Sequence, residues 1–216
     1  NTRGYLQLLQ QNYDDAMIDF DAAIAIDMEY PQPLNNRGLV RIAQEEFDKA
    51  VKEFDAAIKL DSKGPVFFRQ RRHGFNNEVI DVYKFRSMYI DQCDYTAAKV
   101  VTKGDPRVTP VGRWLRRTSF DEMPQLLNVL AGDMSLVGPR PEIPEMIPYY
   151  GDKAAVVLSV KPGITSLAKL VGRDDINFDE TLEFDTRYVA ERSLALDMKL
   201  LFGTVWMVIK GKNVGH

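Results

Sequence analysis

Hydrophobic residues recur with a helical period through the first 61 residues, and the pattern occurs twice. Residues 1–27 align with residues 35–61 at an offset of 34. The matching pairs include glycine, alanine and aromatic positions: Gly4 and Gly38, Ala16 and Ala50, Phe20 and Phe54. Each copy predicts two amphipathic helices, with small residues where the helices approach closely and aromatic rings between them.

A period of 34 residues with these small and aromatic positions resembles the tetratricopeptide repeat. The resemblance implies helical hairpins whose concave face binds peptides. A role as a simple scaffold fits the same pattern, and both interpretations stay open. Two repeats are fewer than a continuous core normally needs. We therefore expect them to pack against the following domain, a partner chain or further repeats.

The pattern changes near Gly64. Residues 64–74 and 78–88 are short, β-branched and aromatic, and they predict two strands joined by a turn at 73–77. The rest is predicted to contain a charged loop at 103–112, helices at about 119–130, 142–159, 178–191 and 194–210, and a break at 161–164. The expected fold is mainly α with a small β component: tetratricopeptide hairpins at 1–61, joined to a mixed α/β domain at 62–216.

Charge is unevenly distributed along the chain. The net charge is −3, yet residues 1–60 carry 11 acidic and 6 basic side chains, and residues 61–119 carry 12 basic and 6 acidic. The basic section suggests an anionic ligand. The overall charge argues against a dedicated nucleic-acid protein, and binding of single strands by residues 69–117 would show as a strong salt dependence. We expect no nucleic-acid partner.

Cysteine and histidine are scarce, and the apolar segments are short. Cys93 is the single cysteine, so the chain has no internal disulfide framework. His73 and His216 do not cluster with it, which makes a zinc site unexpected. The sequence has no run of about 18 or more apolar residues, so no membrane-spanning helix is expected.

Two adjacent carboxylates, Asp121 and Glu122, stand at the start of an apolar segment and admit two interpretations. Ser119 followed by Glu122 is a capping-box pattern, which is purely structural. Alternatively, the arginines at 113, 116 and 117 make this helix start an anion site, where Asp121 stays ionised and attacks a phosphoryl group. Two carboxylates beside a phosphate would also hold Mg²⁺.

Two further clusters carry positive charge. In residues 135–142, "SLVGPRPE", glycine and two prolines fix a turn from which Arg140 projects, suited to bidentate phosphate binding. A solvated arginine in a stiff connector explains that cluster equally well. In "YKFRSM", a strand would place Lys84 and Arg86 on one face, as any half-buried strand with a charged outer face would.

The order of these segments resembles the bacterial sugar transferase family, the monotopic phosphoglycosyl transferases that act on polyprenyl phosphate. The motifs are "GPVFFRQRRHG", "YKFRSM", the stretch from Asp105 to Glu142 and "KPGITSLAKLVGR", and the resemblance covers about residues 62–213. It implies transfer of a sugar 1-phosphate from a UDP-sugar to undecaprenyl phosphate, with release of UMP, at the start of polysaccharide or glycoconjugate synthesis.

The resemblance also implies roles for individual residues. Asp121 would be the nucleophile that forms an aspartyl-phosphosugar intermediate, and Glu122 would help to bind Mg²⁺, with both carboxylates as metal ligands. The remaining residues would bind the diphosphate or nucleotide: Lys84, Arg86, Arg107, Arg113, Arg117, Arg140 and Pro141. The alternative from another class is a repeat-based interaction protein whose transferase-like domain is catalytically silent.

One departure concerns the membrane. The family carries a re-entrant hydrophobic segment before the "GPVFF" region, and here residues 47–63 form a helix of the repeat instead. A natural fusion, an engineered replacement, and a loss of the membrane residues with renumbering of the remainder all fit. The resemblance implies a location on the cytoplasmic face of the bacterial inner membrane. Residues 193–212, with Leu194, Trp206 and flanking Lys199, Lys210 and Lys212, would either lie in the membrane interface or pack on the core.

Overall fold

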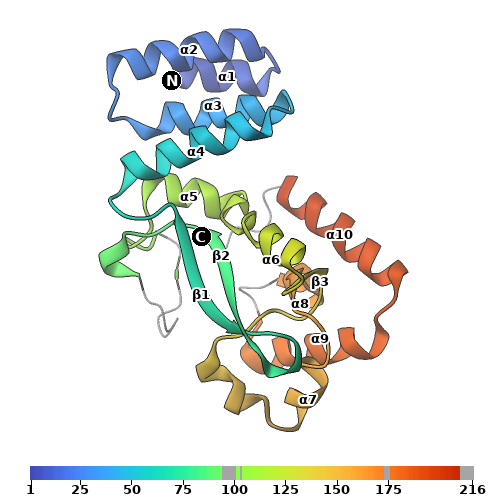
Figure 1. Cartoon of the computed structure of the whole chain (residues 1–216). Coiled ribbons are helices and arrows are strands. Elements are labelled where there is room, and N and C mark those ends of the chain that lie inside the picture. The colour runs from blue at the N-terminus through green and yellow to red at the C-terminus, as the bar shows by residue number, and fades with distance from the viewer. Residues whose placement is uncertain (94–100, 103, 173–175, 210–216) are drawn as a thin grey trace. The chain divides into compact units, whose positions relative to one another are not determined.

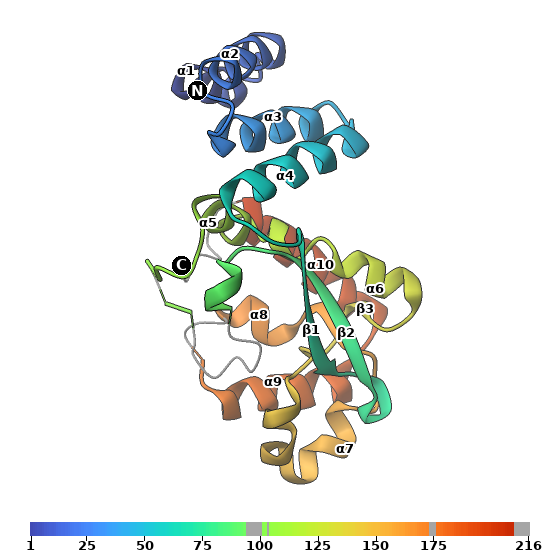
Figure 2. The same ribbon diagram turned by 60° about the vertical axis from the view of Figure 1, so that its left-hand side comes forward.

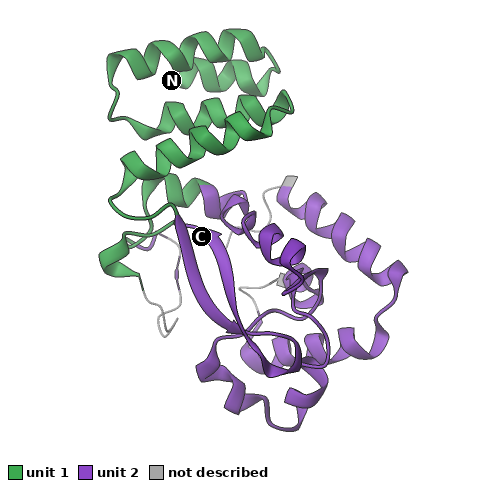
Figure 3. Cartoon of the chain, in the orientation of Figure 1, with its two compact units in different colours: residues 1–66, 86–93, 106–114 green, residues 67–85, 94–105, 115–216 purple. Residues whose placement is uncertain are grey.

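The computed structural model describes residues 1–93, 101–102, 104–172 and 176–209. These residues divide into two compact units, which Figure 3 distinguishes by colour. Unit 1 comprises residues 1–66, 86–93 and 106–114, and unit 2 comprises residues 67–85, 94–105 and 115–216.

Unit 1 begins with four helices, as the two-fold pattern predicts (Figure 1). Neighbours along the chain pack against each other, so the four form a continuous series. The helices are α1 (Thr2–Leu9), α2 (Tyr13–Ile26), α3 (Pro31–Ala43) and α4 (Phe47–Asp61). The assignment of these hairpins to the tetratricopeptide family stays a prediction.

The two hairpins make equivalent contacts at equivalent positions. A Cβ atom on Gly4 would lie 2.8 Å from the Phe20 ring, and one on Gly38 would lie 2.7 Å from the Phe54 ring. Both glycines are therefore required by close helix packing. The ion pair Arg3–Asp19 in the first hairpin likewise recurs 34 residues later as Arg37–Glu53. The internal repeat is therefore present in the structure as well as in the sequence.

Two further segments of unit 1 contact α4. Trp114, in α5 (Pro110–Arg117), stacks on Phe54 with ring centroids 5.6 Å apart. The guanidinium of Arg86 donates to the carbonyls of Ile58, Ser62 and Lys63, at and just after the C-terminal end of α4, where main-chain carbonyls need further donors. A short 3₁₀ turn, η2 (Ile90–Gln92), also belongs to this unit.

Unit 2 starts with the predicted β-hairpin (Figure 1), formed by β1 (Phe67–His73) and β2 (Val79–Phe85). The strands pair antiparallel with His73 opposite Val79. The turn η1 (Phe75–Asn77) places Asn76 and Asn77 at positive φ, a backbone region that asparagine tolerates better than most residues. β2 ends at Phe85, directly before Arg86, and the Arg86 backbone N–H donates to the Val66 carbonyl at 2.8 Å. The placement of Lys84 and Arg86 on one face stays a prediction.

The second half of unit 2 is a series of short elements followed by two longer helices. They are η3 (Phe120–Glu122), α6 (Gln125–Ala131), β3 (Ser135–Val137), η4 (Pro144–Lys153), α7 (Ala154–Val157), β4 (Gly163–Thr165), α8 (Leu167–Gly172), α9 (Phe178–Glu191) and α10 (Leu194–Ile209). The long helices occur where the pattern predicts them. The expected helix at 142–159 is instead a 3₁₀ stretch, interrupted at Gly151, followed by one helical turn.

A small parallel sheet, β3 with β4, was not expected from the sequence. Its geometry explains two glycines, because a Cβ atom on Gly138 would lie 2.4 Å from the Lys161 carbonyl oxygen and one on Gly163 would lie 2.1 Å from the Gly138 nitrogen. With the hairpin, it gives the described residues two two-stranded sheets. The expected fold class, mainly α with a small β component, is confirmed.

The C-terminal helix α10 has two unlike faces. Leu200 is buried with Val137 and Tyr188 in a core to which α8 also contributes, and α8 packs against both α9 and α10 (Figure 2). The opposite face exposes apolar side chains: Leu194, Met198, Phe202, Val205 and Trp206. Core packing is therefore confirmed for one face.

Lys210 and Lys212 lie outside the described residues. In the described part of the chain, helices long and apolar enough to cross a membrane are absent.

Candidate active site

The carboxylate pair lies on a single 3₁₀ turn, η3, rather than at the start of a long helix. Ser119 has left-handed backbone angles (φ 56°, ψ 16°) and its side chain makes no capping hydrogen bond. The predicted capping box and the predicted continuous helix over 119–130 are therefore wrong. Pro124 lies between η3 and α6, and its missing N–H is tolerated there because it precedes the helix proper.

Asn128 fixes the neighbouring helix to the hairpin. It is fully buried on α6, its Oδ1 accepts from the Tyr83 backbone N–H at 3.1 Å, and its Nδ2 donates to the Asp81 carbonyl at 2.7 Å. A buried amide with both ends bonded to main chain defines a single arrangement of two elements. Because Asn128 follows Glu122 by only six residues, this arrangement brings β2 beside the carboxylates.

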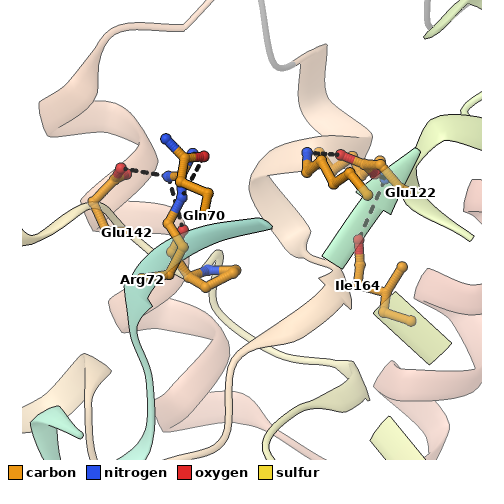
Figure 4. A network of polar contacts seen from close by, with 8 residues as sticks. Gln70, Arg72, Glu122, Glu142 and Ile164 are labelled. Atoms are coloured by element: carbon orange, nitrogen blue, oxygen red, sulfur yellow. Dashed lines mark hydrogen bonds and ion pairs between the residues drawn. The ribbon is translucent and has the colours of Figure 1, made fainter. Parts of the chain in front are cut away.

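Glu122 is held by two lysines (Figure 4). Lys84 Nζ lies 2.9 Å from Glu122 Oε1, and Lys169 Nζ lies 2.7 Å from Glu122 Oε2. Lys169 also donates to the Ile164 carbonyl at 3.3 Å. Asp121 is itself 8% exposed. The structure therefore gathers Asp121, Glu122 and two cations from distant segments, and sequence reasoning missed Lys169.

The "GPRPE" segment is held by a second polar group, also shown in Figure 4. Arg72 on β1 donates to Gln70 Oε1, at 2.7 Å from Nη2, and to the Pro141 carbonyl and Glu142 Oε1, each at 3.2 Å from Nη1. The His73 backbone N–H donates to the Glu142 carbonyl at 2.7 Å. Strand β1 thus fixes the backbone immediately after Arg140.

Helix α9 holds the same segment from another direction. Asp185 is 1% exposed, and its Oδ2 accepts from the Arg140 backbone N–H at 3.3 Å. Burial raises the pKa of Asp185 from 3.8 to about 7, opposed by the hydrogen bond and charge of Arg140 and reinforced by the charge of Glu142. Arg140 is therefore positioned through its backbone by β1 and α9, with its side chain half-buried.

The other predicted anion-binding residues divide between the two units. Arg117 is exposed at the end of α5, and Pro141 is half-buried and accepts from Arg72; both belong to unit 2 with the carboxylates. Arg86, Arg107 and Arg113 belong to unit 1. Arg86 is 3% exposed, and its hydrogen bonds to the end of α4 give it a structural task.

The carboxylates fit a hard cation only as a minimal site. Within the described residues, no group of three or more histidine, cysteine, aspartate or glutamate side chains is arranged to hold a metal ion. Mg²⁺ commonly takes one or two carboxylates and completes its shell with water and substrate phosphate. Asp121 and Glu122 could supply these two carboxylate ligands, although both Glu122 oxygens already accept hydrogen bonds from lysine.

Three relatives carry names that describe an activity. Undecaprenyl-phosphate glucose phosphotransferase of Komagataeibacter xylinus is 45% identical over 165 residues, which is 70% of this chain and 31% of that protein. Undecaprenyl-phosphate galactose phosphotransferase of Salmonella typhimurium is 38% identical over 161 residues, 68% of this chain and 34% of that protein. UDP-glucose:undecaprenyl-phosphate glucose-1-phosphate transferase of Escherichia coli is 44% identical over 153 residues, 67% of this chain and 33% of that protein.

The chain thus spans about a third of the length of these relatives. The sequence profile of the bacterial sugar transferases matches residues 50–211, which is most of the chain and begins within α4 rather than at residue 62. Its matched region contains both carboxylates, the two lysines that hold Glu122 and the "GPRPE" segment. The chain belongs to the bacterial sugar transferase family.

Proposed function

We propose that this protein transfers a sugar 1-phosphate from a UDP-sugar to undecaprenyl phosphate, releasing UMP and starting polysaccharide or glycoconjugate synthesis. The observation that carries the proposal is the group formed by Asp121, Glu122, Lys84 and Lys169. It combines a candidate nucleophile with the positive charge that a diphosphate requires. The names of the relatives support the same substrates.

In the first step, an Asp121 carboxylate oxygen attacks the sugar-bearing phosphorus of the donor. The bond from that phosphorus to the bridging oxygen breaks, and UMP leaves with the bonding electrons. The product on the protein is an aspartyl-phosphosugar, which divides one difficult displacement into two easier ones. Lys84 and Lys169 contribute positive charge near the transferring group.

In the second step, a phosphate oxygen of undecaprenyl phosphate attacks the same phosphorus and displaces the Asp121 carboxylate. The products are undecaprenyl diphosphate sugar and the regenerated enzyme. Arg140, on its doubly fixed segment, would bind phosphate oxygens of the donor through its planar guanidinium. Lys84, Arg117 and Pro141 are proposed to line the same anionic pocket.

Mg²⁺ is proposed as the cofactor, held by Asp121 and Glu122 together with donor phosphate oxygens. When bound, it would neutralise charge that develops on the diphosphate as the bond to UMP breaks. The chain's own residues would bind and orient the donor. Because relatives are named for both glucose and galactose, the sugar is left to experiment.

A membrane surface is the proposed location, on the cytoplasmic face of the bacterial inner membrane, where undecaprenyl phosphate is accessible. The exposed apolar face of α10 supports this, because Phe202 is 67% and Trp206 60% exposed. Aromatic and aliphatic side chains on one helix face can lie at the boundary of the acyl chains.

The test is UMP release from UDP-glucose, UDP-galactose and the UDP-N-acetyl sugars, with Mg²⁺ and detergent-dispersed undecaprenyl phosphate. Wild type is compared with Asp121→Asn and with Asp152→Asn, an exposed aspartate of unit 2 that serves as the matched control. We expect Asp121→Asn to lower the rate at least about 10³-fold and the control to change it little. Radiolabelled sugar phosphate should remain attached to the wild-type protein and should not become attached to Asp121→Asn.

Undiminished UMP release in Asp121→Asn would remove Asp121 as the nucleophile. Absence of release from every donor, with all proteins folded, would favour the catalytically silent alternative. Release from one donor would name the sugar as well as the reaction.

A further inference from the structure

Lys169 occupies an unexpected position beside the candidate metal ligands. It is the single charged residue of α8, and its side chain is 11% exposed. Its ammonium donates to Glu122 Oε2 at 2.7 Å and to the Ile164 carbonyl at 3.3 Å. A lysine buried this far normally has a specific anionic partner, and here that partner is Glu122.

The place of the ammonium is set by the backbone around it. Ser166 Oγ accepts from the Lys169 backbone N–H at 3.1 Å, which fixes the first turn of α8. Ile164 lies in β4, so the acceptor carbonyl is part of a hydrogen-bonded strand. Lys169 is thus anchored at both ends of its side chain, and Lys84, with a side chain 21% exposed, is the less enclosed of the two lysines.

The charges of Lys169 and Glu122 determine how their contact affects metal binding. Glu122 carries one negative charge and faces two ammonium groups, so its oxygens are already satisfied without a metal. A divalent cation at the same carboxylate would be repelled by an ammonium a few ångströms away, in surroundings where Coulomb energies exceed those in water. Metal binding through Glu122 therefore requires Oε2 to exchange one cation for another.

We propose that Lys169 is a positioning residue that holds Glu122 and competes with the divalent cation for its carboxylate. The proposal rests on the proposed function, because it assumes that Asp121 and Glu122 receive the metal. In the absence of cation, Lys169 keeps Glu122 ordered and its charge balanced. When donor diphosphate and cation arrive together, the ammonium is released from Oε2 and becomes available to a phosphate oxygen.

The test measures metal binding directly rather than turnover. Mn²⁺ is titrated into the full chain with UMP present, and free Mn²⁺ is followed by its electron paramagnetic resonance signal. Lys169→Gln and Lys169→Met remove the charge, and Lys169→Arg retains it. Lys161→Gln is the matched control, since Lys161 is an exposed lysine of the same unit.

We expect the two neutral variants to bind Mn²⁺ at least about tenfold more tightly than wild type, since a nearby positive charge is removed. Lys169→Arg and Lys161→Gln should bind as wild type does. A purely structural Lys169 would give neutral variants that bind equally or more weakly, and that result would overturn the proposal. Thermal melting identifies any variant that does not fold. Lys169→Arg, which keeps the positive charge, still shows whether that charge governs Mn²⁺ binding.

Failure here and failure of the proposed function give different results. If every variant lacks Mn²⁺ binding, the competition is disproved, along with the metal site at these carboxylates. UMP release by wild type and its loss in Asp121→Asn would still establish the transfer reaction. Conversely, tighter Mn²⁺ binding in Lys169→Gln would stand even if the donor sugar were not found.

Discussion

Glu122 and Glu142 are two shielded carboxylates of the same unit, and they are held in contrasting ways. Glu142 pairs with one guanidinium, whose other donors are committed to Gln70 and to the Pro141 carbonyl. Glu122 pairs with two ammonium groups from separate segments, Lys84 and Lys169. The first arrangement is a rigid fork, and the second consists of two point charges on flexible stems.

The difference separates a part that holds the fold from a part that can exchange its partners. A guanidinium bonded to three groups at once cannot move without breaking all three contacts. An ammonium can rotate away from one oxygen towards another at smaller cost. We therefore assign Arg72 and Glu142 to positioning of the "GPRPE" segment, and Glu122 with its lysines to binding of charged ligands.

The largest expected effect on stability comes from substitution of Arg72, which holds Glu142. Arg72→Met should lower the free energy of unfolding by about 3–5 kcal/mol, because it leaves Glu142 enclosed without its cation and Gln70 without its donor. Arg71→Met, at an exposed neighbouring position, is the control and should change it little. Urea unfolding measures both. Equal effects of the two substitutions would contradict the structural role of Arg72.

Asp185 adds a third carboxylate, which receives a backbone N–H and has a raised pKa. Because its pKa is about 7 in the folded protein and 3.8 in the unfolded chain, the folded state binds the proton more tightly. Its contribution to stability should be full below about pH 4 and should be lost as the pH rises towards 7, by up to about 4 kcal/mol.

Asp185→Asn should remove that pH dependence. Unfolding free energies at pH 4, 5.5 and 7.5 should therefore favour the variant increasingly as the pH rises. Asp179→Asn, an exposed position on the same helix, should keep the wild-type profile. Parallel profiles for wild type and Asp185→Asn would show that another group governs the dependence.

A smaller effect compares the two glutamates directly. Glu122→Gln leaves two ammonium groups facing a neutral amide, whereas Glu142→Gln leaves Arg72 with two of its acceptors. We expect Glu122→Gln to lower the free energy of unfolding by about 1–2 kcal/mol more than Glu142→Gln does. Chemical denaturation of the matched pair tests this, and the reverse order would refute the contrast.

The smallest effect concerns the backbone beside the carboxylates. Ser119 has φ 56°, where a side chain is unfavourable and glycine is not. Ser119→Gly should therefore be more stable than Ser119→Ala by about 1 kcal/mol. Thermal unfolding of the two variants decides it, and an alanine variant as stable as the glycine variant would show that the strain is absent.

The sequence predicted those parts of the molecule that have a strong local pattern. Repeated helical periodicity identified α1 to α4, and alternating β-branched and aromatic residues identified the hairpin. The carboxylate pair was found because adjacent acids at a segment start are conspicuous. β3 and β4 were missed because strands of three residues in glycine- and proline-rich segments have no measurable period.

Contacts between distant residues were beyond the reach of local pattern. Lys169 is separated from Glu122 by 47 residues, and Arg72 from Glu142 by 70. A lone lysine in the apolar stretch "SLAKLV" was the available signal for the first. The capping box failed for a related reason: the Ser-x-x-Glu spacing was present, but Lys84 and Lys169 hold the glutamate side chain.

The ladder between β3 and β4 has a consequence for recombination between relatives. Gly138 donates to the Thr165 carbonyl and Gly163 donates to the Pro139 carbonyl, so the segment with Arg140 and the segment with Lys169 are hydrogen-bonded to each other. Neither glycine position has space for a Cβ atom. In a chimaera, residues 135–142 and 161–169 should therefore be inherited from one parent, as a single cassette.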